Sequence, residues 1–178
     1  GDVLVLGKPL GVGVFSAALK KQALDAAGYA RLIATTTRLN TPGPDLARLG
    51  GVHAMTDVTG FGLAGHALEM ARGSRLRLHI DWAAVPLLAQ ARALAQAGFV
   101  TGASGRNWAS YGEQVRLAEG FGDLDRALLC DPQTSGGLLV ACARDSLDEV
   151  LDTFRRHGFD EATVIGEVRD GEPGLDVG

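Results

Sequence analysis

The stretch of the chain best suited to chemistry is residues 55–62, where an acidic residue is followed by a glycine-rich turn. Asp57 ends a short apolar segment, and Thr59, Gly60 and Gly62 precede a helical pattern. Such a turn exposes backbone N–H groups at a helix N-terminus, which favours phosphate oxygens. A carboxylate beside phosphates suits Mg²⁺, which usually takes one or two carboxylates. The residues alone leave open the alternative that Asp57 caps a turn and the glycines permit close packing.

Two further glycine-containing stretches could approach a ligand. Residues 131–137 read Asp-Pro-Gln-Thr-Ser-Gly-Gly, and Asp-Pro starts turns while glycine lets a backbone come close to a ligand. A structural turn explains the same residues, and it is the interpretation we favour. Residues 8–14 share two glycines with a dinucleotide fingerprint, but Ser16 stands at the third glycine position. We therefore expect Lys8 to be solvated rather than bound to phosphate.

The cysteines and histidines give no clear sign of chemistry. Cys130 has no neighbouring base or helix N-terminus that would lower its pKa, so we expect it to be buried and inert. Cys142 lies in an apolar strand pattern and is expected in the core. Asn107, in the glycine-containing stretch 102–107, could belong to a loop that closes over a ligand. No pair of histidines has metal-ligand spacing, and we expect each of the four to be structural: His53, His66, His79 and His157.

Composition places the chain among ordinary globular domains. It has 178 residues, of which 46% are hydrophobic and 21% charged, enough for one domain with a full core. The net charge of −4 without basic clusters argues against nucleic-acid binding. No apolar run reaches the roughly 18 residues of a membrane span, and no leader pattern is visible, so we expect a cytoplasmic protein. The chain has no initiator methionine and enters a strand pattern at once, so we expect a piece of a longer protein.

Hydrophobic periodicity predicts strands alternating with helices. Strands are predicted at 3–6, 52–56, 76–80, 138–143 and 162–168, and helices at 12–27, 63–73, 86–98 and 146–158. A weaker helical stretch over 31–49 is interrupted by Pro42 and Pro44. Gly28 is expected to end the first helix, and Ser146 with Glu149 is expected to form a capping box. Residues 99–129 resist assignment, and the tail after Asp170 is expected to be a turn. This order predicts an α+β fold, a mixed sheet with helices packed on it and split βαβ (ferredoxin-like) elements, as a single domain over 1–178.

Four motifs together resemble selenophosphate synthetase in order and spacing. They lie at 1–14, 56–67, 102–107 and 131–139. The resemblance implies a C-terminal domain of the architecture shared with aminoimidazole ribonucleotide synthetase, thiamine-phosphate kinase and a hydrogenase-maturation protein. It implies that the whole protein is a homodimer that converts selenide, ATP and water into selenophosphate, AMP and phosphate with Mg²⁺. An N-terminal domain, absent here, would form most of the ATP site, so we expect this chain alone to be inactive.

The resemblance also assigns roles to individual residues. The acid of the family's Thr-Asp-Val/Ile-Thr-Gly-Phe-Gly motif is a magnesium ligand and falls on Asp57, while Thr59, Gly60 and Gly62 would shape the phosphate-side turn. No catalytic residue is expected in this chain, because the family's nucleophile and essential lysine lie in the other half. Gly7 stands where the family usually has Thr, which weakens a role for Lys8.

Other functions stay open from the sequence alone. They are an ATP-dependent enzyme of the hydrogenase-maturation type, a binding or regulatory module without chemistry, and a family member that has lost selenide activity.

Overall fold

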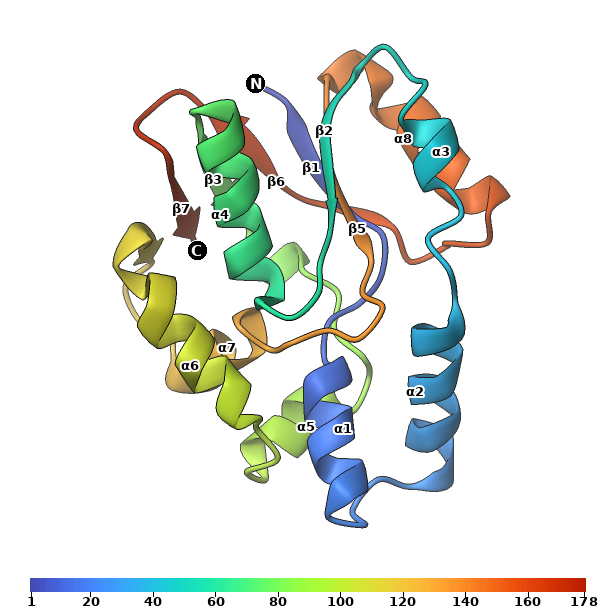
Figure 1. Ribbon diagram of the computed structural model, residues 1–178, viewed down its shortest axis with the longest axis vertical. Helices are drawn as coiled ribbons and strands as arrows, with labels where there is room; N and C mark the ends of the chain where they lie inside the picture. Colours follow the sequence, from blue (N-terminus) through green and yellow to red (C-terminus); the bar gives the residue numbers. More distant parts are fainter.

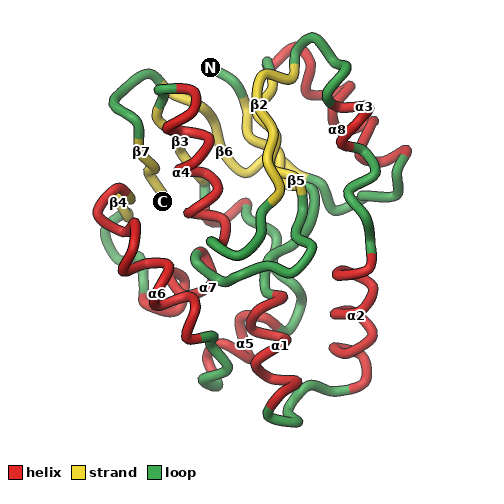
Figure 2. Tube along the Cα trace, viewed as in Figure 1, coloured by secondary structure: helices red, strands yellow, loops and turns green.

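The computed structural model describes all residues, 1–178, and is built on a mixed seven-stranded sheet with helices on both faces (Figures 1 and 2). The strands lie in the order β2-β5-β1-β6-β3-β7-β4. The predicted α+β class is confirmed. The strands are β1 (Val3–Leu6), β2 (Val52–Asp57), β3 (Arg77–Ile80), β4 (Val115–Leu117), β5 (Leu138–Cys142), β6 (Thr163–Arg169) and β7 (Gly174–Val177).

The sheet contains the predicted split βαβ unit. β5 and β6 each pair antiparallel with β1, which lies between them, so β5 and β6 run parallel to each other. Helix α8 (Leu147–Arg156) connects them along the chain. At the other end of the sheet, β3, β7 and β4 pair parallel. β2, which carries Asp57 at its last position, lies at one edge of the sheet.

Side chains of the interior strand β1 alternate between the two faces of the sheet and so contribute to two clusters of the core. Leu4 and Leu6 pack in the larger cluster with α4 (Gly62–Ser74), whereas Val3 and Val5 pack with α8. Successive side chains of a strand point to opposite faces, so a strand buried on both sides is apolar throughout. The short helix α3 (Gly43–Leu46) lies with α8 on the second face (Figure 1).

A third cluster lies below the sheet as drawn in Figure 1. Phe15 and Leu128 are among its buried members. Helix α6 lies beside α4 and α7. The helices of this lower region are α1 (Val12–Lys20), α2 (Ala26–Thr37), α5 (Ala91–Gln96), α6 (Gly102–Tyr111) and α7 (Asp123–Leu129).

Several predicted helix boundaries were wrong. Gly28 does not end the first helix: it lies inside α2, and its N–H donates to the Asp25 side chain that caps this helix. By contrast, the predicted interruption of the helical stretch over 31–49 is confirmed: α2 ends at Thr37 and α3 begins at Gly43, because Pro42 lacks the N–H that a continuous helix needs. The helix predicted from 86 begins only at Ala91, since residue 87 is held in a bridge with residue 10.

Other differences reflect long-range pairing. The tail after Asp170 is not only a turn, because it includes β7, which lies between β3 and β4. Residues 99–129 form α6, β4 and α7.

The predicted capping box at Ser146 was wrong. Ser146 makes no capping hydrogen bond because its backbone is helical, whereas a cap needs an extended one.

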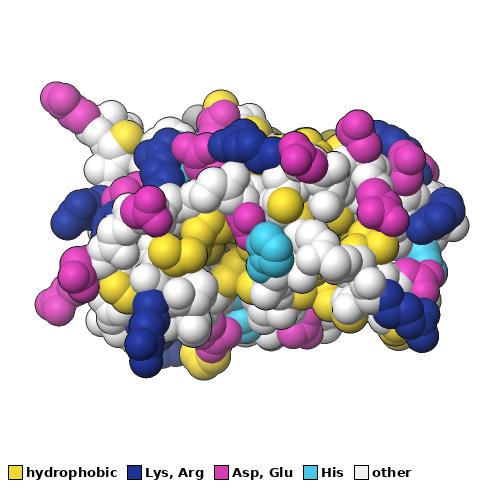
Figure 3. Space-filling model, turned by 90° about the horizontal axis from the view of Figure 1, so that it is seen from above, with side chains coloured by type: hydrophobic (Ala, Val, Ile, Leu, Met, Phe, Trp, Pro, Cys, Tyr) yellow, Lys and Arg dark blue, Asp and Glu magenta, His cyan; other side chains and the backbone are white.

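The surface carries charges of both signs. Figure 3, the view from above, shows acidic and basic side chains mixed around the rim and apolar side chains gathered in a hollow near the middle. A groove between β2 and α4 is lined by residues 53–56 together with Glu69, Met70, Gly73 and Ser74. No helix is both long enough and apolar enough to cross a membrane.

Candidate functional site

The glycine-rich turn after β2 presents a mixture of exposed and buried residues. Asp57 is exposed at the end of the strand, Val58 is fully buried and Thr59 is half-buried. Gly62 opens α4 with a φ of 70°, which favours glycine, and a Cβ there would lie 2.6 Å from the carbonyl carbon of Cys130. The backbone therefore requires glycine at position 62.

Three successive backbone donors of this turn are free. The N–H groups of Thr59, Gly60 and Phe61 donate to no acceptor in the chain. They directly precede α4, whose N-terminus has no side-chain cap. Free N–H groups at the positive end of a helix are suited to bind an anion such as phosphate. The geometry of the turn is therefore compatible with the predicted binding of phosphate oxygens.

Helix α6 holds the turn from one side. The Asn107 side chain donates to the carbonyl oxygens of Gly60 at 2.9 Å and Cys130 at 3.1 Å. The Tyr111 hydroxyl donates to the Phe61 carbonyl at 2.6 Å. Residues 102–107 are thus the first part of a helix that supports the turn, which decides the question that the sequence left open about a loop at Asn107.

The 131–137 segment holds the turn from the other side. The N–H of Gln133 donates to the Thr59 carbonyl at 2.9 Å, and the N–H of Val58 donates to the Gly137 carbonyl at 2.9 Å. A Cβ at Gly136 would overlap the Val58 carbonyl oxygen. This close backbone approach explains why glycine stands at position 136.

The same segment also caps α1. Asp131 Oδ2 accepts from the N–H groups of Gly13 at 2.9 Å and Val14 at 3.3 Å. Gln133 Oε1 accepts from the N–H groups of residues 11–12, both at 3.2 Å. The glycine-containing start of α1 is therefore filled by the chain's own side chains, and the structural interpretation of residues 131–137 is supported.

Asp131 is an unusual carboxyl group. It is 0% exposed, and its Oδ1 atom has no hydrogen-bond partner. Burial raises the pKa of Asp131 to about 7, although the hydrogen bonds from Val14, Gln133 and Gly13 act in the opposite direction. A Cβ at Gly13 would collide with Asp131 Oδ1, so that glycine makes room for the carboxyl group.

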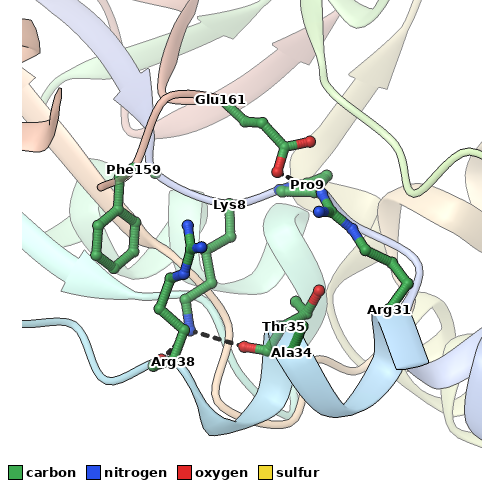
Figure 4. Close-up of a pocket in the computed structure, with 9 residues that line it drawn as sticks. Lys8, Pro9, Arg31, Ala34, Thr35, Arg38, Phe159 and Glu161 are labelled. Carbon is green, nitrogen blue, oxygen red and sulfur yellow. Dashed lines mark hydrogen bonds and ion pairs between the residues drawn. The ribbon is translucent and has the colours of Figure 1, made fainter. Parts of the chain in front are cut away.

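Lys8 is not solvated, and that prediction was wrong. It is 3% exposed, and its Nζ donates to the carbonyl oxygens of Thr35 at 3.3 Å, Arg38 at 2.7 Å and Ser135 at 2.6 Å. Figure 4 shows the lysine pointing toward the end of α2, where a helix dipole favours a cation. Burial and the nearby Arg38 charge lower the pKa of Lys8 to about 8. Lys8 therefore joins α2 to the 131–137 segment.

Both cysteines are buried and free, as predicted, and burial raises the pKa of each thiol. His66 was expected to be structural, and its two ring nitrogens contact Thr59 and Glu69. The spacing of His66 and Glu69, three residues apart on a helix, was visible in the sequence. The contact with Thr59 was not.

Asp57 is the carboxylate of the exposed turn. The chain holds no group of three or more His, Cys, Asp or Glu residues that could bind a metal ion by themselves. One carboxylate beside phosphate oxygens is nevertheless a donor set that Mg²⁺ commonly accepts. Asp57 could therefore supply one ligand of a magnesium site only if the remaining ligands were provided by a nucleotide or by another part of the protein.

Comparison with known proteins gives consistent matches over the whole chain. The chain is 64% identical over 177 residues to a protein named selenide, water dikinase from Burkholderia ambifaria, and it covers 50% of that protein. It is 60% identical over 178 residues to a protein of the same name from Pseudomonas straminea, also covering 50% of it. The chain thus spans about half the length of the curated relatives it matches.

A solved structure shows the same fold. E. coli HypE, a hydrogenase maturation protein, superimposes with a TM-score of 0.70 at 22% identity, over 99% of this chain and 46% of that one. The family model described as "AIR synthase related protein, C-terminal domain" matches residues 1–177. Because this match covers the chain almost completely, the chain belongs to the family of AIR synthase related proteins, as the C-terminal domain.

Proposed function

We propose that the chain is the C-terminal domain of a selenide, water dikinase. The observation that carries the proposal is 64% identity to a protein of that name along 99% of the chain. The whole protein would use ATP, selenide and water to make selenophosphate, AMP and phosphate. It would act in the cytoplasm as a homodimer, with its N-terminal half supplying most of the nucleotide site.

The exposed turn supports a role on the phosphates of ATP. The free N–H groups of residues 59–61 would bind phosphate oxygens, and Asp57 would hold Mg²⁺ beside them. The ion would neutralise the charge that develops during phosphoryl transfer. Asn107, Tyr111 and the 131–137 segment keep the turn in place, so that its donors are already oriented when the nucleotide arrives.

The test is selenide-dependent formation of AMP from ATP and Mg²⁺. It compares the full-length parent protein, its Asp57→Asn variant and the isolated chain. We expect activity in the parent, a loss of about 100-fold or more in the variant, and none in the isolated chain. Asp170→Asn, which changes another exposed acid, is the control and should keep full activity.

Each unexpected result has a definite meaning. Turnover by Asp57→Asn with normal magnesium dependence would refute the metal role. A parent that makes no AMP with selenide but hydrolyses ATP with another substrate would refute the assignment and favour an enzyme of the hydrogenase-maturation type. The likeness to HypE does not favour that rival beforehand, because 22% identity is evidence of fold alone. Unchanged nucleotide affinity in Asp57→Asn, with no activity in the parent, would favour a binding module.

A further inference from the structure

His66 joins the glycine-rich turn to the body of α4. Its Nε2 lies 3.1 Å from Thr59 Oγ1, and its Nδ1 lies 2.9 Å from Glu69 Oε2. The histidine is 6% exposed, whereas the Glu69 side chain is 49% exposed. The Phe61 ring lies 5.8 Å from the imidazole, centroid to centroid. Each ring nitrogen therefore has one polar partner.

The chemistry of these partners determines the direction of both hydrogen bonds. An ionised carboxylate such as Glu69 only accepts, so Nδ1 of His66 carries the proton and donates it. In a neutral imidazole the other nitrogen is then an acceptor. The Thr59 hydroxyl must therefore donate to Nε2, which leaves only the lone pairs of Oγ1 available to other groups.

We propose that His66, oriented by Glu69, is a positioning residue that holds the Thr59 hydroxyl as a hydrogen-bond acceptor beside Asp57. The inference rests on the proposed function and deepens it. A phosphate oxygen is itself an acceptor and gains nothing from such a hydroxyl. The water molecules of a hydrated divalent cation are donors and match it.

The placement of Thr59 agrees with this role. Thr59 follows Asp57 by two residues, with the fully buried Val58 between them, and both polar residues keep access to solvent, because Asp57 is exposed and Thr59 is half-buried. In this proposal the turn binds two groups. The free backbone N–H groups of residues 59–61 bind the anion, and the side chains of Asp57 and Thr59 bind the hydrated cation. This changes the prediction that Thr59 belongs to the phosphate side.

The chain provides a matched comparison at a distance from the turn. His157 also contacts a threonine and a carboxylate, but with its nitrogens exchanged: Nδ1 lies 3.1 Å from Thr41 Oγ1, and Nε2 lies 2.9 Å from Asp45 Oδ2. The same reasoning gives His157 the opposite tautomer, with the proton on Nε2. A ¹⁵N NMR spectrum should therefore show the proton on different ring nitrogens in the two histidines.

The first experiment is ¹⁵N NMR of the full-length parent protein labelled on histidine nitrogens. The spectrum is recorded at about pH 8.5, some two units above the ordinary histidine pKa of about 6.5. His66→Leu and His157→Leu variants assign the signals. We expect a protonated Nδ1 and a bare Nε2 for His66, and the reverse for His157. A protonated Nε2 on His66 would overturn the proposal, whatever the enzyme's activity.

The second experiment asks whether His66 acts through Thr59. Thr59→Val and His66→Leu should each raise the magnesium concentration needed for half-maximal AMP formation by about 10- to 100-fold. The double variant should be no worse than Thr59→Val alone, because two residues that act as one unit are not additive. His157→Leu should leave the magnesium requirement unchanged.

Additive losses, or lower activity at an unchanged magnesium requirement, would show that His66 only supports the fold and would overturn the proposal. If His66→Leu does not fold, Glu69→Leu replaces it, since Glu69 is half exposed and its loss frees the imidazole tautomer. A parent without selenide-dependent activity refutes the proposed function instead, and the NMR result still decides the direction of the hydrogen bonds.

Discussion

Replacing the buried Asp131 by asparagine should remove a specific part of the pH dependence of stability. The side-chain oxygen of the introduced asparagine can still accept from the N–H groups of Gly13 and Val14, so the cap of α1 is retained. The amide nitrogen of the asparagine then takes the place of Oδ1, which has no partner in the unaltered chain. The substitution therefore removes the titration while it preserves the shape of the side chain.

The size of the effect follows from the pKa of this carboxyl group. Burial raises it from an ordinary value of 3.8 to about 7 in the folded chain. At about 1.4 kcal/mol per pH unit, this difference corresponds to about 4 kcal/mol. Between about pH 4 and pH 7 the folded chain keeps a proton that the unfolded chain releases. The stabilisation from this group is thus fully present below about pH 4 and lost by about pH 7.

The assay is urea denaturation of the unaltered chain and of Asp131→Asn at several values between pH 4 and pH 8. The free energy of unfolding of the unaltered chain, minus that of the variant, should fall by about 4 kcal/mol over this range. Asp170→Asn is the control, because Asp170 is exposed. It should follow the unaltered chain at every pH.

One result would refute the argument. If the unaltered chain and Asp131→Asn show parallel dependence on pH, the carboxyl group has no raised pKa in the folded state. The hydrogen bonds from Gly13, Val14 and Gln133 would then lower the pKa of Asp131 by as much as burial raises it.

Two stability predictions test the other contacts that hold the site together. Lys8→Met leaves three carbonyl groups without their donor, so thermal denaturation should show a loss of about 1–3 kcal/mol. The exposed Lys20→Met should change little, and equal effects would contradict the role of Lys8. Gly136→Ala places a methyl group against the Val58 carbonyl and should cost about 3 kcal/mol in urea denaturation. Gly105→Ala, in the middle of a helix with open space around it, should be neutral or stabilise by about 0.5–1 kcal/mol, and a similar loss in both would contradict the steric argument.

The elements predicted correctly from the sequence are those with a strong local pattern. The apolar run of β1 and the turn from Asp57 to Gly62 into α4 are visible in consecutive residues. The alternation of Arg77, Leu78, His79 and Ile80 likewise shows β3. Strand propensity, period and turn chemistry are properties of neighbouring residues, so they can be recognised without the fold.

The elements that were missed depend on distant partners. β7 is a strand because β3 and β4 lie on either side of it, and nothing in residues 174–177 alone requires this. Helix α6 has glycines at 102 and 105, which lower helix propensity, yet it packs beside α4 and α7. In these cases tertiary packing overrides the weak local preference.

The sequence by itself determined the α+β class, the candidate turn with Asp57, and the likeness to a known family through four ordered motifs. The tertiary structure alone decided how these motifs meet. It buries Lys8 against Ser135, which lies 127 residues away, and Asp131 against Gly13, which lies 118 residues away. It also joins His66 to Thr59. Burial, pKa and the direction of a hydrogen bond depend on which atoms surround a group, and folding brings those atoms from remote parts of the chain.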